Sequence, residues 1–219
     1  MDESGTGPQR PVLPARVTGA PRTSLERLAE GNERFLETIA ASPNEAGVAA
    51  ALAIADPYAI VLGCSDSRVP PEAVFNETVG RLFVVRVVAH VAGRAEMGSI
   101  EYAVARWNCP LIVVLGHTQC GGIAAALDRL PPGADKPPDS ASSMNLGTLV
   151  ASVKSNLGWI SSSASPDPWL YAVTLNVRRT IEQLTTWSPL LRGHVQAGRM
   201  AIVGAIYHVE NGAVEFLEA

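Results

Sequence analysis

Two short apolar runs, each closed by a glycine and followed at once by a metal-binding type of residue, constrain this chain most. The runs are Tyr58–Gly63 and Leu111–Gly116. Runs of this length that are rich in Val, Ile and Leu are typical of strands buried on both faces of a parallel sheet. Cys64 follows the first run and His117 follows the second. Because the carboxyl ends of parallel strands meet at one edge of an open α/β sheet, we expect these two side chains to converge there.

Cys120 lies three residues after His117 and completes a set of three soft ligands. Two thiolates and one imidazole suit zinc, and three protein ligands leave a fourth position for water or a carboxylate. A closed structural zinc site uses four protein ligands. The shortfall of one ligand therefore favours a catalytic metal.

The other predicted elements alternate between strand and helix, which is typical of βαβ units. Further strands are predicted at 82–88, 200–207 and 213–217, the last after an Asn-Gly hairpin signal. Predicted helices span 24–41 (after a cap at Thr23), 49–55, 97–108, 121–130, 144–159, 168–187 and 189–197, with a loop at 131–143. We therefore predict an α/β fold, a mainly parallel β-sheet flanked by α-helices, with an N-terminal helical arm.

Length and composition fit one domain with a sizeable core, because the chain has 219 residues of which 47% are hydrophobic. Residues 1–22 are rich in Pro, Gly and Arg and lack an apolar segment, so we predict a flexible N-terminal tail there rather than a signal peptide. Residues 23–219 are predicted to form a single zinc-binding α/β catalytic domain.

Charge and cysteine content exclude several classes of partner. The net charge is −4, no basic stripe is visible, and no apolar stretch reaches the roughly 18 residues of a membrane span, so neither nucleic acid nor a membrane is expected. The three cysteines are an odd number, and two have ligand-like neighbours, which argues against a disulfide framework. A reducing, cytoplasmic location fits best.

One pair of motifs carries a resemblance to a known family. Cys64-x-Asp66-x-Arg68, followed by His117-x-x-Cys120 and two glycines, resembles the β-class carbonic anhydrases. Further blocks of similarity are Phe83-Val84-Val85-Arg86, Ser99-Ile100-Glu101-Tyr102-Ala103, Asn176-Val177-Arg178, Ser188-Pro189-Leu190-Leu191 and Gly204-Ala205-Ile206-Tyr207. The resemblance covers roughly residues 24–217.

The resemblance implies a zinc-dependent carbonate dehydratase that catalyses the reversible hydration of CO2 to bicarbonate and a proton through hydroxide formed at zinc. It implies that Cys64, His117 and Cys120 are zinc ligands and that Asp66 and Arg68 form a catalytic dyad. Asp66 either pairs with Arg68 or swings in as a fourth zinc ligand, and both arrangements stay open. The resemblance also implies a homodimer, in which N-terminal helices embrace the neighbouring subunit, or a homotetramer.

Three positions depart from the family pattern. Ala55 stands where many members carry a Gln that contacts the substrate, which predicts a weaker enzyme. Val61 replaces the Trp of a regulatory bicarbonate pocket, so we do not expect that pocket. His90 takes the place of an Asn, and we expect a packed interface residue rather than a proton shuttle.

Ala55 and His90 keep two other functions open. The site could hydrolyse another small electrophile, such as carbonyl sulfide, carbon disulfide or a biosynthetic intermediate. Alternatively, Asp66 could permanently complete a structural zinc site in a non-catalytic homologue.

The remaining singled-out residues have simpler interpretations. Cys109 is expected in the core, and His194 and His208 at the surface or an interface. Arg86 needs an acceptor, either in a buried structural pair or in an anion. The Gly121-Gly122 helix start is expected to serve close packing, because it lacks the Lys and Ser/Thr of a phosphate loop.

Overall fold

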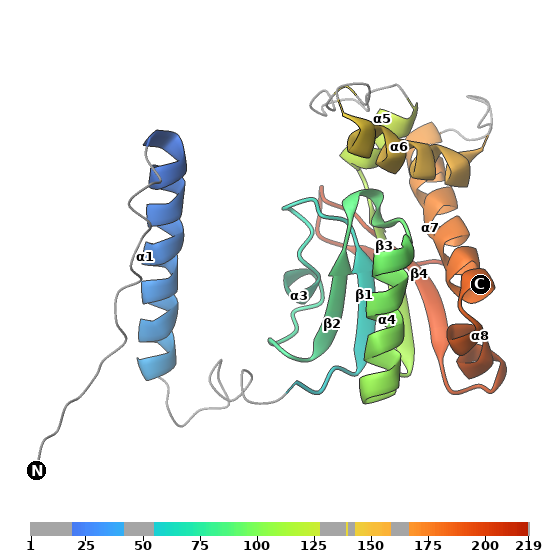
Figure 1. Cartoon of the computed structure of the whole chain (residues 1–219), viewed down its shortest axis with the longest axis horizontal. Coiled ribbons are helices and arrows are strands. Elements are labelled where there is room, and N and C mark those ends of the chain that lie inside the picture. The colour runs from blue at the N-terminus through green and yellow to red at the C-terminus, as the bar shows by residue number, and fades with distance from the viewer. Residues whose placement is uncertain (1–18, 42–54, 128–138, 140–142, 159–166, 219) are drawn as a thin grey trace, which may run out of the picture. The chain divides into compact units, whose positions relative to one another are not determined.

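The computed structural model describes residues 19–41, 55–127, 139, 143–158 and 167–218 (Figure 1). The chain divides into two compact units, residues 1–55 and residues 56–219. The predicted helix at 49–55 and most of the predicted loop at 131–143 lie outside the described residues. The division into a tail of residues 1–22 and a domain of residues 23–219 stays a prediction.

In the first unit, helix α1 spans Gly19–Ala41. The predicted start at Ser24, after a cap at Thr23, was therefore wrong, because the helix is already formed at Gly19. Pro21 lies in the first turn, where a missing N–H costs no intrahelical hydrogen bond and the fixed φ of proline suits the helix. The apparent capping signal thus lies inside the helix.

The second unit is built on one five-stranded sheet with the order β2-β1-β3-β4-β5. Its strands are β1 (Ala59–Gly63), β2 (Leu82–Arg86), β3 (Leu111–His117), β4 (Ala201–Tyr207) and β5 (Val214–Phe216). The first four run parallel, and β5 pairs antiparallel with β4. The turn before β5 contains Gly212 at a φ of 77°, a left-handed conformation that favours glycine, as the Asn-Gly signal predicted.

Six helices and one 3-10 turn of the second unit are described, and most match the predicted ranges. They are α3 (Pro71–Val74), the turn η1 (Val88–His90), α4 (Arg94–Trp107), α5 (Gly121–Leu127), α6 (Met144–Leu157), α7 (Pro168–Trp187) and α8 (Pro189–Gln196). Several boundaries differ from the sequence-based expectation, and α3 was not predicted. β2 ends at Arg86 instead of residue 88 because η1 intervenes, and α4 begins before Met97 because the side chain of Glu96 accepts the backbone N–H of Gly93.

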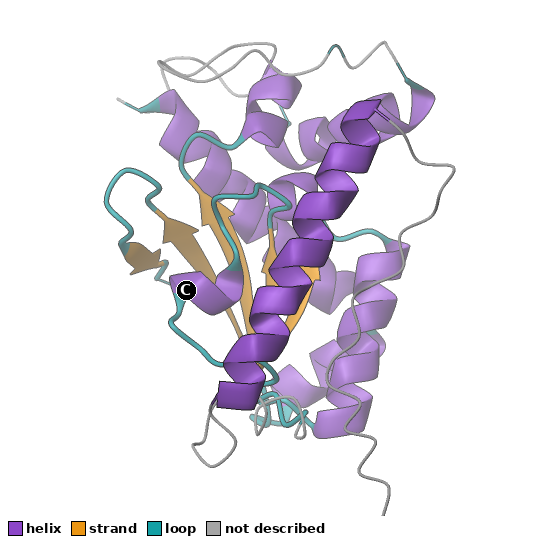
Figure 2. Ribbon diagram, turned by 90° about the vertical axis from the view of Figure 1, so that its left-hand side faces the viewer, coloured by secondary structure: helices purple, strands orange, loops and turns teal. Residues whose placement is uncertain are grey.

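Helices of the second unit pack on the sheet, with α4 against β2 and α7 against β3 and β4, which confirms the predicted fold class (Figure 2). All five residues of β1 are buried, as a parallel central strand requires. Ile60 and Leu62 join a large core with residues of α4, α5, α6 and α7, while Val61 faces a smaller core on the opposite side. Among the described helices, none is both long enough and apolar enough to cross a bilayer.

Helix α7 approaches the sheet over two glycines. A Cβ added at Gly204 of β4 would lie 2.7 Å from Cγ1 of Val177, and one added at Gly116 of β3 would lie 2.7 Å from Cγ2 of the same residue. Both separations are far below ordinary van der Waals contact. The absence of side chains at these two positions therefore sets the distance between α7 and the strand that carries His117.

We expect Gly204→Ala to lower the free energy of unfolding by about 1–3 kcal/mol, because the new methyl group overpacks the contact with α7. Urea denaturation measures the change. Gly193→Ala in α8 is the matched control, since a Cβ there meets nothing within 4 Å. Replacing a glycine inside a helix should be neutral or stabilising by up to about 1 kcal/mol. Equal losses in the two variants would contradict this account of the packing.

Candidate metal centre

The carboxyl ends of β1 and β3 bring the three predicted ligands together. Gly63 pairs with Leu115 in the parallel register, so Cys64, directly after β1, and His117, the last residue of β3, lie at almost the same level. A turn then returns the chain so that Cys120 reaches the same place. The ligand atoms of Cys64, His117 and Cys120 all lie within 4.8 Å of one another, and all three residues are buried.

The imidazole of His117 is oriented for a metal. Its Nδ1 lies 2.8 Å from the backbone oxygen of Thr118, and it must donate its hydrogen there because a carbonyl only accepts. Nε2 is then left with a free lone pair, and this atom is buried without a hydrogen-bond partner. A buried nitrogen of this kind is costly unless a cation binds it. A backbone carbonyl on the far nitrogen is the usual way in which a metal-binding histidine is held.

The two sulfurs are spaced for one tetrahedral ion. Sγ of Cys64 lies 3.9 Å from Sγ of Cys120. Two Zn–S bonds of about 2.3 Å at a tetrahedral angle place sulfurs about 3.8 Å apart. The donor set and its spacing therefore fit zinc.

A hydrogen bond between the two sulfurs shifts the pKa values of the two thiols in opposite directions. The hydrogen bond from Cys120 and the nearby His117 lower the pKa of Cys64, whereas the hydrogen bond to Cys64 and burial raise the pKa of Cys120. A second thiolate beside the first would be strongly unfavourable in this buried place. A divalent cation removes that penalty by making both sulfurs ligands.

Asp66 and Arg68 form the predicted pair. Nε of Arg68 lies 3.0 Å from Oδ1 of Asp66, and Nη2 lies 2.8 Å from Oδ2. The backbone N–H of Arg68 donates to Oδ1 as well, at 3.0 Å. These hydrogen bonds lower the pKa of Asp66 to about 2, so this carboxyl group is ionised at every physiological pH. Of the two arrangements left open by the sequence, the structure has the one in which Asp66 is held by Arg68.

Arg68 also joins the two loops of the site. Its Nη1 donates to Oε1 of Gln119 at 3.1 Å, and Gln119 lies in the turn between His117 and Cys120. Gln119 has a φ of 58°, a left-handed value that folds this turn tightly. One guanidinium thus fixes both Asp66 and the turn that carries two of the three candidate ligands.

Arg86 holds the loop after β1 from the other side. Its Nε donates to the backbone oxygen of Cys64 at 2.8 Å, and Nη2 donates to the backbone oxygen of Asp66. The sequence left a structural pair and an anion contact open for Arg86, and these backbone carbonyls are the acceptors found. Arg86 therefore positions the backbone on which the sulfur and the carboxylate are mounted.

A largely apolar cavity opens beside the metal centre. It measures about 280 Å³, and its wall contains Cys64, Asp66 and Val88 together with apolar side chains of α5 and α6. Leu149, Val150 and Val153 of α6 belong to this wall. No sequence signal linked α6 to the site, because its residues lie about 85 positions after Cys64 and show only ordinary helical periodicity.

The other predicted residues fall in different places. His90 is completely buried, and desolvation lowers its pKa to about 4, so it is neutral at pH 7. It packs on Asn176 of the same chain, which corrects the expectation of an interface residue.

Cys109 is 1% exposed, as predicted for a core residue. At Gly122 a Cβ would lie 2.7 Å from Cγ1 of Val88, which confirms close packing there, whereas at Gly121 it would meet nothing within 4 Å.

The other residues singled out in the sequence lie outside the ligand group. Val61 is buried in β1, and Ala55 is exposed before β1 begins. His194 is half-buried in α8, and Nε2 of His208 lies 3.5 Å from Oε2 of Glu215. None of these four belongs to the described Cys–His–Cys group.

Comparisons with known proteins agree with this geometry. The model of the carbonic anhydrase family matches residues 59–214. A carbonic anhydrase of Mycolicibacterium smegmatis is 35% identical over 200 residues, which cover 89% of this chain and 92% of that protein. Carbonic anhydrase 2 of Mycobacterium tuberculosis is 36% identical over 197 residues, covering 88% and 90%.

Solved structures share the fold. A tetrameric β-carbonic anhydrase of Sordaria macrospora superposes with a TM-score of 0.70 at 23% identity, covering 90% of this chain and 98% of that one. The Coccomyxa β-carbonic anhydrase, solved with acetazolamide, gives a TM-score of 0.68 at 25% identity, covering 88% and 86%. The chain therefore belongs to the carbonic anhydrase family, in its β class.

Proposed function

We propose that this protein is a zinc carbonic anhydrase that catalyses the reversible hydration of CO2 to bicarbonate and a proton. One observation carries the proposal: the buried Cys64, His117 and Cys120 group lies beside an ionised carboxylate and an apolar cavity. Zinc bound by these three side chains would supply a water acidic enough to act as hydroxide near neutral pH.

Asp66 orients the nucleophile in this proposal. Its carboxylate can only accept hydrogen bonds, because its pKa of about 2 keeps it ionised. Arg68 occupies one side of each carboxylate oxygen and leaves further lone pairs available. A water or hydroxide that donates to Asp66 has its remaining lone pair fixed in direction, which favours attack on one face of the substrate.

The cavity suits an uncharged substrate. CO2 has no net charge or dipole, so apolar side chains such as Leu149 and Val153 accept it without the cost of an unpaired polar group. The volume of about 280 Å³ is several times the roughly 30 Å³ of a water molecule. Bicarbonate is charged and leaves such a wall readily.

The pairing of Asp66 with Arg68 supports catalysis over a purely structural zinc site. A structural site would need Asp66 as a permanent fourth ligand, whereas its two oxygens are held by the guanidinium and the backbone of Arg68. The fourth position is then available to solvent.

We expect the purified protein to contain one zinc per chain and to hydrate CO2. Cys64→Ala should lose both zinc and activity, because two protein ligands bind the ion poorly. Asp66→Ala should keep zinc but lose activity by about 100-fold or more. Metal analysis and stopped-flow CO2 hydration measure these effects.

Cys109→Ala is the control for the loss of a buried thiol, since Cys109 lies outside the ligand group. It should retain zinc and activity. A zinc-loaded protein that shows no hydration from about pH 7 to about pH 9 would rule out the proposed function.

Arg68→Met tests whether the pair acts through position or through charge. The pKa of Asp66 should rise from about 2 toward its usual value near 3.9, so Asp66 still stays ionised at neutral pH. We therefore expect kcat to fall about 100-fold by the same factor across about pH 6.5 to 9. Arg81→Met is the matched control, because Arg81 also pairs with an aspartate, Asp56, and its side chain is 44% exposed against 50% for Arg68. A loss confined to the acidic side of the pH profile would contradict the positional role.

For assembly, we propose a homodimer formed through α1, with a homotetramer as a pair of such dimers. Leu28 is 72% exposed and Phe35 is 38% exposed, and their spacing of seven residues puts them on one face of the helix. A second copy of the chain would bury this apolar face. The similar protein of Sordaria macrospora is described as tetrameric, which supports a higher assembly.

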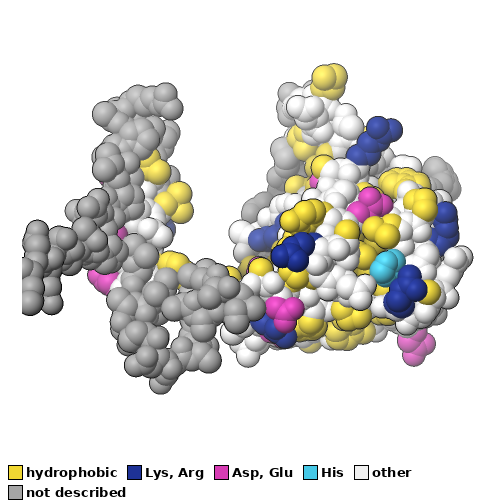
Figure 3. Space-filling model, turned by 60° about the horizontal axis from the view of Figure 1, so that its bottom comes forward, with side chains coloured by type: hydrophobic (Ala, Val, Ile, Leu, Met, Phe, Trp, Pro, Cys, Tyr) yellow, Lys and Arg dark blue, Asp and Glu magenta, His cyan; other side chains and the backbone are white. Residues whose placement is uncertain are grey.

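The other partners are small molecules in this proposal. The net charge is −4, and on the face shown in Figure 3 basic and acidic side chains are dispersed among apolar ones. Such a surface offers little to nucleic acid. All three cysteines are free thiols, which fits the reducing cytoplasm as the location.

The assembly is tested by Leu28→Glu combined with Phe35→Glu. Burying two carboxylates in the interface is costly, so the mass measured by light scattering should fall toward that of the monomer, 23.0 kDa. Glu30→Gln is the control, because residue 30 lies about 200° around the helix from residue 28. A double variant that keeps the wild-type mass would exclude α1 as the interface.

A further inference from the structure

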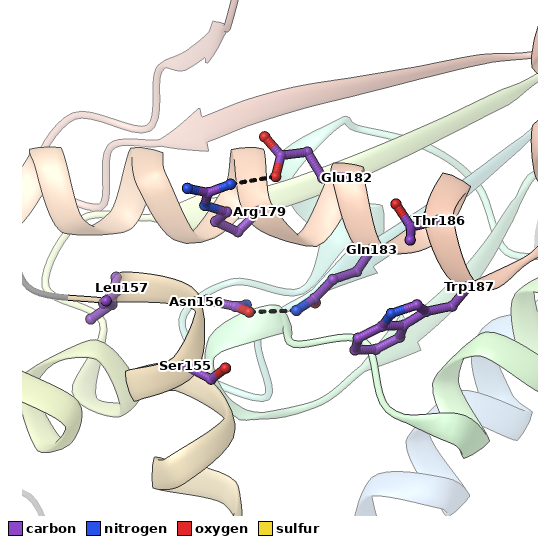
Figure 4. Close-up of a pocket in the computed structure, with 9 residues that line it drawn as sticks. Ser155, Asn156, Leu157, Arg179, Glu182, Gln183, Thr186 and Trp187 are labelled. Carbon is purple, nitrogen blue, oxygen red and sulfur yellow. Dashed lines mark hydrogen bonds and ion pairs between the residues drawn. The ribbon is translucent and has the colours of Figure 1, made fainter.

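A chain of hydrogen-bonded amides leads from a second surface cavity toward the candidate metal centre. This cavity, of about 300 Å³, lies between the end of α6 and α7, and Asn156 and Gln183 are in its wall (Figure 4). Nε2 of Gln183 donates to Oδ1 of Asn156 at 2.6 Å. Nδ2 of Asn156 then donates to Oδ1 of Asn176 at 2.9 Å. Every donor in this chain points inward.

Asn176 is the last of these amides, and it is hydrogen-bonded to the turn η1. Its Nδ2 donates one hydrogen to the backbone oxygen of Ala89 at 2.8 Å and the other to Nε2 of His90 at 2.9 Å. Both hydrogens of the amide are therefore used, and its oxygen is fixed by Asn156. Asn176 is completely buried and Asn156 is 5% exposed, so water cannot easily replace these contacts.

The turn η1 needs these hydrogen bonds from Asn176. Ala89 has a φ of 57° and His90 a φ of 45°, and two consecutive left-handed residues with side chains are unfavourable without support from their surroundings. Gly122 of α5 lies against the same turn, close to Val88 and Ala89. The turn is thus held between α5 and α7.

The result of this strained conformation is a hydrogen bond to a candidate metal ligand. The backbone N–H of Ala89 lies 3.3 Å from Sγ of Cys64 and donates to it. An N–H donor draws electron density from a thiolate, so the sulfur gives less charge to a bound metal. Water on a metal with two thiolate ligands would be less acidic than water on a metal bound by imidazoles alone. A hydrogen bond that withdraws electron density from one thiolate would offset part of this difference.

We propose that Asn176, oriented by Asn156, is a positioning residue for the Cys64 sulfur, because it holds the Ala89 N–H on that atom. The inference rests on the proposed metal site but assigns a role to residues outside it. Neither asparagine touches the substrate cavity beside Cys64. Their effect is carried by the backbone of one turn.

The test uses the full-length protein with Co(II) in place of zinc, because thiolate-to-cobalt charge transfer absorbs in the near ultraviolet and reports on the sulfur. In Asn176→Ala the band should move to longer wavelength, since a sulfur without its N–H donor is easier to oxidise. Release of zinc to an excess of chelator should become about tenfold faster, because the Ala89 N–H no longer holds the Cys64 sulfur in position. Asn156→Ala should change both quantities in the same direction by a smaller amount.

Thr180→Val is the matched control. Thr180 lies on α7 one turn beyond Asn176 and is completely buried, and its hydroxyl has no hydrogen-bond partner within the described residues. The isosteric change removes a buried polar group from the same helix but should leave the band and the zinc-release rate unchanged.

The outcomes separate this proposal from the proposed function. Absence of a thiolate-to-cobalt band in the wild-type protein would overturn the metal site itself. A wild-type band that is unchanged in the asparagine variants would overturn only the positioning role. If circular dichroism shows that Asn176→Ala does not fold, Asn156→Ala decides, because Asn156 lies in the wall of a surface cavity and its loss leaves both donors of Asn176 in place. An unshifted band in that variant would then refute the proposal.

Discussion

The rest of the structure depends on holding two sulfurs and one imidazole nitrogen together at a buried edge of the sheet. Sγ of Cys64 and Sγ of Cys120 lie 3.9 Å apart, a distance at which two thiolates repel strongly in a poorly solvated place. The fold compensates in several ways. His117 presents an unprotonated Nε2, the Ala89 N–H faces one sulfur, and a divalent cation would complete the balance of charge. The sheet register makes this possible, because Gly63 and Leu115 are paired.

Two arginines fix the conformation of the loop after β1. Arg86 binds backbone carbonyls and fixes the path of the loop, whereas Arg68 binds the side chain of Asp66 and the turn at Gln119. Asp66 is therefore held by an arginine beside the candidate metal ligands. Charge-assisted hydrogen bonds to both carboxylate oxygens, together with one from the backbone, oppose its movement toward the candidate ligand group. The same contacts that hold Asp66 away from the candidate ligand group also keep its carboxylate ionised.

The sequence was sufficient for the parts of the fold that rest on local pattern. The strand ending at Gly63 and the helix α7 were predicted within a residue, because an uninterrupted apolar run and a proline at the first helical position give strong signals. The ligand set was likewise predictable from its position after two glycine-closed strands. The start of α1 was missed because a capping pattern occurs inside the helix. The grip of Asn176 on the turn could not be predicted, because it joins residues 87 positions apart and depends on unusual φ values that no local pattern encodes.

The place of His90 bears on which small electrophile the site accepts. His90 departs from the family pattern and, in the sequence, kept a reshaped pocket and a different substrate open. In the structure its ring is completely buried and accepts a hydrogen bond from Asn176, and it is not in the wall of the cavity beside Cys64. The histidine is therefore accounted for by the support of the turn, and it lends no weight to carbonyl sulfide or carbon disulfide over CO2. Of the two departures that suggested a different substrate, only Ala55 is left. Ala55 lacks the one neutral hydrogen bond that a Gln would make to the substrate, and a loss of about 0.5–1.5 kcal/mol weakens binding without changing the reaction.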